Sequence, residues 1–94
     1  MEIPKLLKIG NLLYDVGELD EEDEALGRSN HKHQWIKLHP TLKPENKEET
    51  FIHEVLHQIL DESGFFKESD NDKLVNAVAN GVYQFFKDND FLKQ

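Results

Sequence analysis

Residues 44–64 predict one long amphipathic helix, and this segment constrains the fold of the chain more than any other. Proline is preorganised for the first turn of a helix and glycine commonly follows the last one, so Pro44 and Gly64 mark its limits. Apolar side chains recur along it at the spacing of a helical face: Phe51, Ile52, Val55, Leu56, Ile59 and Leu60. At ~100° per residue they cover about half of the circumference, so this half is expected to be buried.

The pentapeptide His53-Glu54-Val55-Leu56-His57 lies in the middle of this helix. His53 and His57 are four positions apart, which places both imidazoles on one face with Cβ atoms ~5–6 Å apart. Zinc binds neutral imidazole nitrogens at ~2.0–2.1 Å, and adjacent turns of a rigid helix supply two of them. Glu54 is expected further round the helix, towards solvent, where its carboxylate can reach a water beside the metal. The alternative is a solvated helix face whose two histidines bind nothing.

The composition narrows the classes of protein and of metal site. Ninety-four residues suffice for one small domain, and the absence of cysteine leaves only histidine and carboxylate as zinc ligands. Neither a signal peptide nor a long apolar run is found, so we expect a cytoplasmic protein with no membrane partner. The net charge of −8 argues against nucleic acid as a direct partner. A monomer is favoured.

The N-terminal half predicts a small sheet of three or four strands. Gly10-Asn11 suits a two-residue hairpin turn between apolar-rich segments. The acidic residues 18–24 are expected to form a solvated connection. The strands are expected over residues 3–9, 12–16, 26–31 and 34–39. His31 and His33 are interpreted as exposed residues of a polar turn or edge rather than as metal ligands.

A second helix is expected over residues 71–88, with Asp70 as its N-cap. If the apolar faces of the two helices pack together, the polar border of this helix meets the histidine stripe. Asp72 then becomes the third zinc ligand, and Asn76 accepts a hydrogen bond from a ligand imidazole or, as the alternative, binds the metal itself. The other interpretation of Asp72 is an acid favoured by the helix dipole.

With these residues, the chain resembles the very small gluzincin-type (minigluzincin-like) metallopeptidases, short HExxH proteins encoded by phages and prophages. The resemblance covers a short sheet, residues 50–64 around the HExxH motif, and residues 75–89. In gluzincins the third ligand is a glutamate on a following helix, with an acid one turn later that contacts a ligand histidine. Asp72 and Asn76 match these positions and depart from both residue types. The resemblance implies an α+β fold, a small sheet packed on two helices, in one minimal zincin-like domain spanning residues 1–94.

The activity that the resemblance implies is hydrolysis of a peptide or protein substrate, with one zinc ion per chain and Glu54 as the general base. An extended substrate is expected to pair with the strand of residues 35–39. His39, just before the metal helix, is a candidate for a contact in the cleft. Tyr83 has a suitable hydroxyl, but it lies ~16 Å along the helix from Asp72, so a core or tail contact is favoured.

Two other functions stay open at this stage. The first is a metal-binding regulatory or interaction module of phage origin with little or no hydrolytic activity. The second is a structural domain with an empty site. The C-terminal tail adds a further question, because Phe91 and Leu92 are expected either to extend the core contact of the last helix or to cover the site in part.

Overall fold

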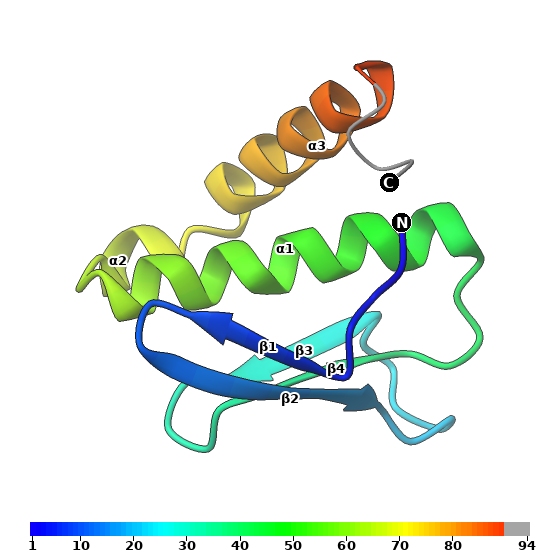
Figure 1. Cartoon of the computed structure of the whole chain (residues 1–94), viewed down its shortest axis with the longest axis horizontal. Coiled ribbons are helices and arrows are strands. Elements are labelled where there is room, and N and C mark those ends of the chain that lie inside the picture. The colour runs from blue at the N-terminus through cyan, green and yellow to red at the C-terminus, as the bar shows by residue number, and fades with distance from the viewer. Residues whose placement is uncertain (90–94) are drawn as a thin grey trace.

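A four-stranded mixed sheet forms the N-terminal half of the protein in the computed structural model, which describes residues 1–89 (Figure 1). A tight turn with Gly10 at φ +60° joins the first two strands, as expected. The order across the sheet is β1-β2-β4-β3, with β2 parallel to β4 and the other pairs antiparallel. The strands are β1 (Leu6–Ile9), β2 (Leu12–Glu18), β3 (Gly27–Asn30) and β4 (Trp35–Leu38).

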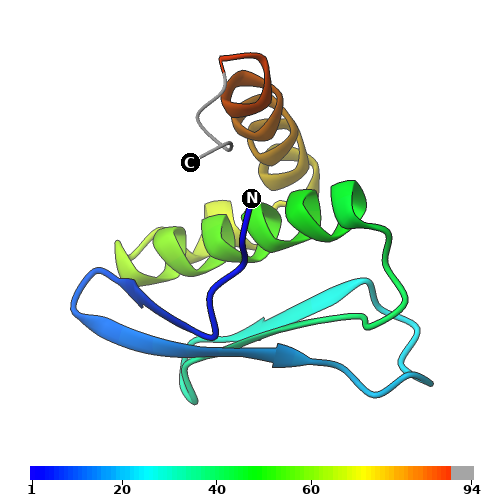
Figure 2. The same ribbon diagram turned by 45° about the vertical axis from the view of Figure 1, so that its right-hand side comes forward.

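The helices are α1 (Pro44–Glu62), the short α2 (Phe66–Ser69) and α3 (Asp72–Asp88). Figures 1 and 2 show α1 lying across one face of the sheet and α3 beyond it. The α+β fold is therefore confirmed, with one difference from the expected packing. Within residues 1–89, α3 contacts α1 and α2 but no strand, because α1 lies between α3 and the sheet.

Two small cores explain this layering, because α1 carries apolar side chains on both of its long sides. Phe51 packs on the sheet in a cluster with Ile9, Tyr14, Ile36 and Leu38. Its neighbour Ile52 turns to the other side and packs on Ala79 and Tyr83 of α3. The helix that carries the HExxH motif is thus held between two apolar contacts, which fixes its position and rotation.

The residues that end α1 and begin α3 set the positions of the site residues on these two helices. At the C-terminus of α1, Gly64 adopts φ +83°, and the N–H of Phe65 donates to the carbonyl of Leu60, which is the Schellman arrangement. The expected N-cap of the last helix, Asp70, is wrong. Residues 66–69 form the turn of α2, which Asp70 ends, and Asn71 caps α3 by accepting from the Leu74 N–H at 3.1 Å.

The strand limits differ from the expected ones mainly where tertiary pairing extends or shortens them. β2 runs on to Glu18 because Gly17 and Glu18 pair with β4. β1 begins at Leu6, three residues later than expected. In the described part of the chain, residues 1–89, the structure has no helix that is long and apolar enough to cross a membrane.

Candidate metal site

His53, His57 and Asp72 bring one potential ligand atom each to a common point, all within 4.8 Å of one another. The Nε2 atoms of the two histidines lie 3.0 Å apart, and His57 Nε2 lies 3.7 Å from Asp72 Oδ1. Two histidines come from adjacent turns of α1, and the carboxylate comes from the first residue of α3. The three residues predicted as metal ligands are therefore neighbours in the folded protein.

Ser69, at the end of α2, determines which ring nitrogen of His57 carries the proton. The Ser69 hydroxyl donates its only proton to the His57 carbonyl at 3.1 Å, so it can only accept from His57 Nδ1, which lies 3.2 Å away. His57 therefore carries its proton on Nδ1 and presents the lone pair of Nε2. Metal-binding histidines are usually oriented in this way, with the other ring N–H held by an oxygen.

This donor set suits a zinc ion. Two ligand atoms of a tetrahedral ion with bonds of ~2.0–2.1 Å lie about 3.4 Å apart, close to the separations of 3.0 and 3.7 Å seen here. Because His57 Nε2 is an acceptor, the hydrogen of the His53–His57 contact belongs to His53 Nε2. Metal binding through His53 Nε2 would thus require this proton to move to Nδ1. Three protein ligands leave a fourth position open, as in catalytic zinc sites.

Asp72 is the most weakly held member of the group. Its side chain is 81% exposed, against 18% for His57, and within residues 1–89 its contact with His57 is the one polar contact of its carboxylate. Asn76, one turn further along α3, is exposed and lines the same cleft as His53 and Glu54. It makes no hydrogen bond to an imidazole among the described residues, so its expected contact with a ligand stays a prediction.

Glu54 is placed differently from the expectation that it faces solvent, because it is buried with only 7% exposed. The reason is β3, which packs along this side of α1. Gly27 allows the close approach, since a Cβ there would lie 2.7 Å from Thr50 Cγ2 and 3.3 Å from Glu54 Cγ. The Ser29 hydroxyl, on the same face of β3, donates to Glu54 Oε1 at 2.7 Å. One carboxylate oxygen is thereby fixed.

A chain of hydrogen bonds continues from Ser29 through the interior. Gln58 Nε2 donates to Ser29 Oγ at 2.7 Å, and the Tyr14 hydroxyl donates to Gln58 Oε1 at 3.1 Å. His31 Nδ1 lies 3.0 Å from the Tyr14 oxygen, whose own proton is already engaged. Burial raises the pKa of Tyr14, with the negative charges of Glu62 and Asp61 adding to the shift. Every donor in this chain thus points towards Glu54.

A cleft of about 190 Å³ opens beside these groups, between the start of β3 and the two long helices. His53 and Glu54 lie in its wall, and Leu26 and Gly27 form its β3 side. Asn46, Asn76 and Asn80 contribute three side-chain amides. Two carboxylates, those of Glu49 and Glu54, an imidazole and three amides therefore line one small space.

The two residues considered for substrate contacts lie in different places. His39 is in the connection from β4 to α1, where Nε2 lies 3.0 Å from the Glu21 carbonyl oxygen and Nδ1 lies 2.8 Å from the Thr41 hydroxyl. Tyr83 is buried between α1 and α3, and its hydroxyl donates to Glu48 at 2.7 Å. Neither residue has a hydrogen bond to His53, His57 or Asp72 among the described residues.

The Tyr83–Glu48 pair also perturbs two pKa values. Burial, then the hydrogen bond to Glu48, raises the pKa of Tyr83 to about 12. Burial by itself would raise the pKa of Glu48, but hydrogen bonds from the Met1 ammonium and from Tyr83 outweigh it and lower this pKa. The Met1 nitrogen lies 2.9 Å from Glu48. Tyr83 is thus a protonated core residue at neutral pH, which agrees with the favoured core contact.

Ser29, Gln58 and Ser69 were not predicted from the sequence. For Gln58 the sequence holds one signal. Thr50, Glu54 and Gln58 form a polar row at every fourth position of α1, and all three are buried. Such a row is usually solvated, so only the path of β3 shows its role. The suggested cover over the site, Phe91 and Leu92, lies outside the described residues.

Comparison of the chain with protein-family models, with curated proteins and with solved structures gives no match.

Proposed function

We propose that the protein is a zinc-dependent metallopeptidase of the minigluzincin-like type, acting on a peptide or protein in the cytoplasm, which would be that of the host if a phage encodes it. The main support is one juxtaposition. The ligand atoms of His53, His57 and Asp72 lie within 4.8 Å of one another, and His53 shares a cleft with the buried carboxylate of Glu54. Metal donors beside a fixed base are what water-dependent hydrolysis requires.

The roles of the residues follow from their contacts. A zinc ion bound by His53, His57 and Asp72 would polarise the peptide carbonyl and lower the pKa of a water to ~7. Glu54 would take the proton of the attacking water and deliver it to the leaving amine. Because Ser29 holds Oε1, Oε2 is the atom available for this transfer. The hydrogen bond from Ser29 also keeps the carboxylate from rotating out of line.

The expected pairing of a substrate with β4 is wrong, because β4 lies between β2 and β3 and is paired on both sides. β3 is an edge strand of the sheet, so one side of its backbone is open to an added strand. It also borders the cleft through Gly27 and carries Ser29. We therefore assign strand addition to β3, which would bring an extended peptide directly past Glu54.

The decisive experiment uses Glu54→Gln. Glutamine has nearly the shape of glutamate and accepts the Ser29 hydrogen bond, so the fold and zinc affinity are expected to persist while hydrolysis falls by at least ~100-fold. Cleavage of a broad peptide library is followed by mass spectrometry for both proteins. Undiminished cleavage by Glu54→Gln would reject Glu54 as the base.

The second function is a metal-binding interaction module with little hydrolytic activity. One observation favours it: Asp72 is 81% exposed, so the third ligand is weakly positioned for catalysis. The two functions are separated by zinc-loaded wild-type protein in the same peptide library. Bound zinc without any cleavage would favour the module, and cleavage that depends on Glu54 would favour the peptidase.

A further inference from the structure

The cleft beside His53 continues into a wider groove between the first half of α1 and the second half of α3. Asn46, Glu49 and Asn80 line both spaces, so these residues mark where one passes into the other. The groove has a volume of about 850 Å³. A peptide that extends from the cleft into this groove must therefore pass Glu49.

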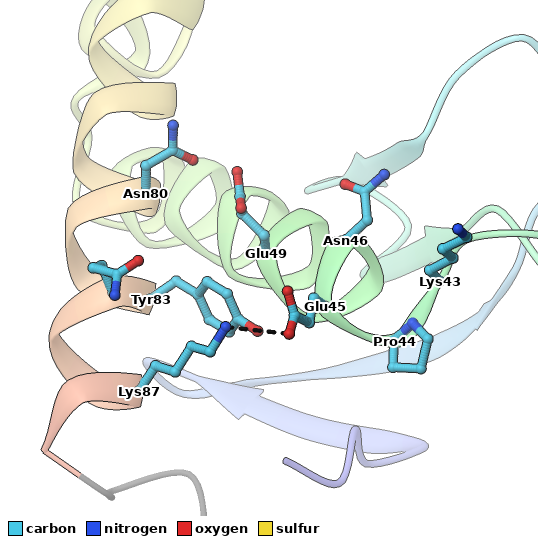
Figure 3. A pocket seen from close by; sticks show the side chains of 9 residues that line it. Lys43, Pro44, Glu45, Asn46, Glu49, Asn80, Tyr83 and Lys87 are labelled. Atoms are coloured by element: carbon cyan, nitrogen blue, oxygen red, sulfur yellow. Dashed lines mark ion pairs between the residues drawn. The ribbon is translucent and has the colours of Figure 1, made fainter.

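Glu49 is well placed to recognise a charge on such a peptide. It lies four residues before His53, so the two side chains share one face of α1, one turn apart. Figure 3 shows its carboxylate between Asn46 and Asn80. Glu49 is half-buried as a residue, and among residues 1–89 no ion pair or hydrogen bond engages its carboxylate. A carboxylate without such a partner is stabilised by a cation.

The two lysines that line the groove are not paired with Glu49. Lys87 is directed to Glu45, with Nζ and Oε1 3.3 Å apart (Figure 3). Lys43 lines only the outer groove, and none of the described residues around the inner cleft is a lysine or arginine. The net charge of −8 adds a general attraction for basic peptides.

We infer that Glu49 selects substrates in which a lysine or arginine side chain lies at the passage from the cleft to the groove. This inference rests on the proposed function, because it concerns the same cleft. The asparagine amides on either side of Glu49 offer donors and acceptors to the peptide backbone, while Glu49 supplies an unpaired carboxylate where the cleft passes into the groove. The substrate class is therefore an extended peptide with a basic residue near the bond that is cut.

The test uses two matched sets of blocked decapeptides in an alanine and serine background. A single lysine is moved through the positions of the first set, and acetyl-lysine, which keeps the length but lacks the charge, replaces it in the second. Two quantities are measured: kcat/KM with zinc-loaded wild-type protein, and peptide affinity for zinc-loaded Glu54→Gln by fluorescence anisotropy. At one position, lysine is expected to exceed acetyl-lysine by about tenfold in both quantities, as for a half-exposed charged hydrogen bond.

Two substitutions at Glu49 then test whether this residue causes the preference for lysine. Glu49→Gln should remove the lysine preference. It is measured alone for kcat/KM and in combination with Glu54→Gln for peptide affinity. Glu49→Lys should reverse the preference in favour of a peptide with glutamate at that position. Glu22→Gln is the control, because it removes the same charge from an exposed residue in the connection between β2 and β3. It should keep the lysine preference. A preference that survives Glu49→Gln, or one that Glu22→Gln removes equally, would overturn the inference.

The other outcomes separate this inference from the proposed function. Cleavage without any lysine preference would overturn the role of Glu49 and leave the peptidase standing. Lysine-dependent binding that requires Glu49, with no cleavage by wild-type protein, would support the role of Glu49 and reject the peptidase. Loss of zinc from Glu49→Gln would overturn the inference, because Glu49 would then hold the metal.

Discussion

Two hydrogen bonds join Ser69 to His57: the serine hydroxyl donates to the histidine carbonyl at 3.1 Å and accepts from ring Nδ1 at 3.2 Å. Ser69 is buried and ends the short helix α2. This helix therefore sets which nitrogen of His57, a candidate metal ligand, carries the proton. The connection between the two long helices is therefore part of the candidate site.

Ser69→Ala removes the acceptor of His57 Nδ1 and leaves this ring N–H without its partner. We expect zinc affinity to fall ~10–100-fold, as for other partners of metal-binding histidines. Affinity is measured by competition with a chromophoric chelator. Ser63→Ala, at the exposed end of α1, is the control and should keep wild-type affinity. Wild-type affinity in Ser69→Ala would show that the orientation of His57 comes from elsewhere.

The loss of zinc affinity on substitution should be greatest for the residues that bind the metal directly. We expect one zinc per chain, no binding by His57→Ala, and strongly weakened binding by Asp72→Ala. Asn76→Ala should cost only ~10–100-fold. In the wild type, free zinc at 100 times Kd should raise the free energy of unfolding by ~2.7 kcal/mol, which thermal melts with and without zinc detect.

Asp70→Ala is the control for this series, because Asp70 is an exposed acid two residues before Asp72 and lies outside the group of donors. It should bind zinc like the wild type. If Asp72→Ala keeps full affinity while Asn76→Ala loses it, the assignment of the third ligand is wrong.

Ser29→Ala should affect both stability and catalysis. It leaves the buried donor of Gln58 and one oxygen of Glu54 without a partner, which costs about 1–3 kcal/mol of unfolding free energy. Because the carboxylate is then free to rotate, kcat should fall more than KM changes. Ser29→Thr keeps the hydroxyl and should restore kcat. Urea unfolding and steady-state kinetics test this, and equal kcat in Ser29→Ala and wild type would contradict it.

The pair of Glu48 and Tyr83 predicts how stability depends on pH. The pKa of Glu48 is lowered below 4.5 in the folded state by the Met1 ammonium and Tyr83, against the effect of burial, with Lys87 assisting. The unfolded chain therefore takes up the proton first as the pH falls. The stabilising contribution of Glu48 is present above pH 4.5 and is lost as the pH falls through the folded-state pKa. Urea unfolding of wild type and Glu48→Gln should thus converge in acid.

At alkaline pH the same pair makes the stability of the fold fall as the pH rises. The pKa of Tyr83 is raised from 10.0 to about 12 by burial and by Glu48, with Glu45 and Glu49 adding negative charge. The unfolded chain loses its proton first, so stability falls between these two pH values. Tyr83→Phe has no such proton and should lack this part of the loss. An identical alkaline decline in both proteins would place the titrating group elsewhere.

Much of the architecture is predictable because its causes are local. The limits of α1 follow from Pro44 and Gly64. The turn at Gly10 follows from the ease with which glycine adopts a positive φ, which is +60° here. His53 and His57 share a face because any helix places residues i and i+4 together. Asp72 needed only one further assumption, that the apolar faces of the two helices pack on one another.

What the tertiary structure alone decided is the environment of these residues. The burial of Glu54 depends on β3 as an edge strand beside α1, and strand order is not encoded in any local pattern. The same holds for Ser29, which approaches Glu54 across 25 positions of sequence. Ser69 reaches His57 only because residues 66–69 form an extra helical turn. The sequence by itself thus determined which groups are present and which helix carries them. Long-range packing determined how each carboxylate and imidazole is held, because a side chain's hydrogen-bond partners come from whichever segments the fold brings next to it.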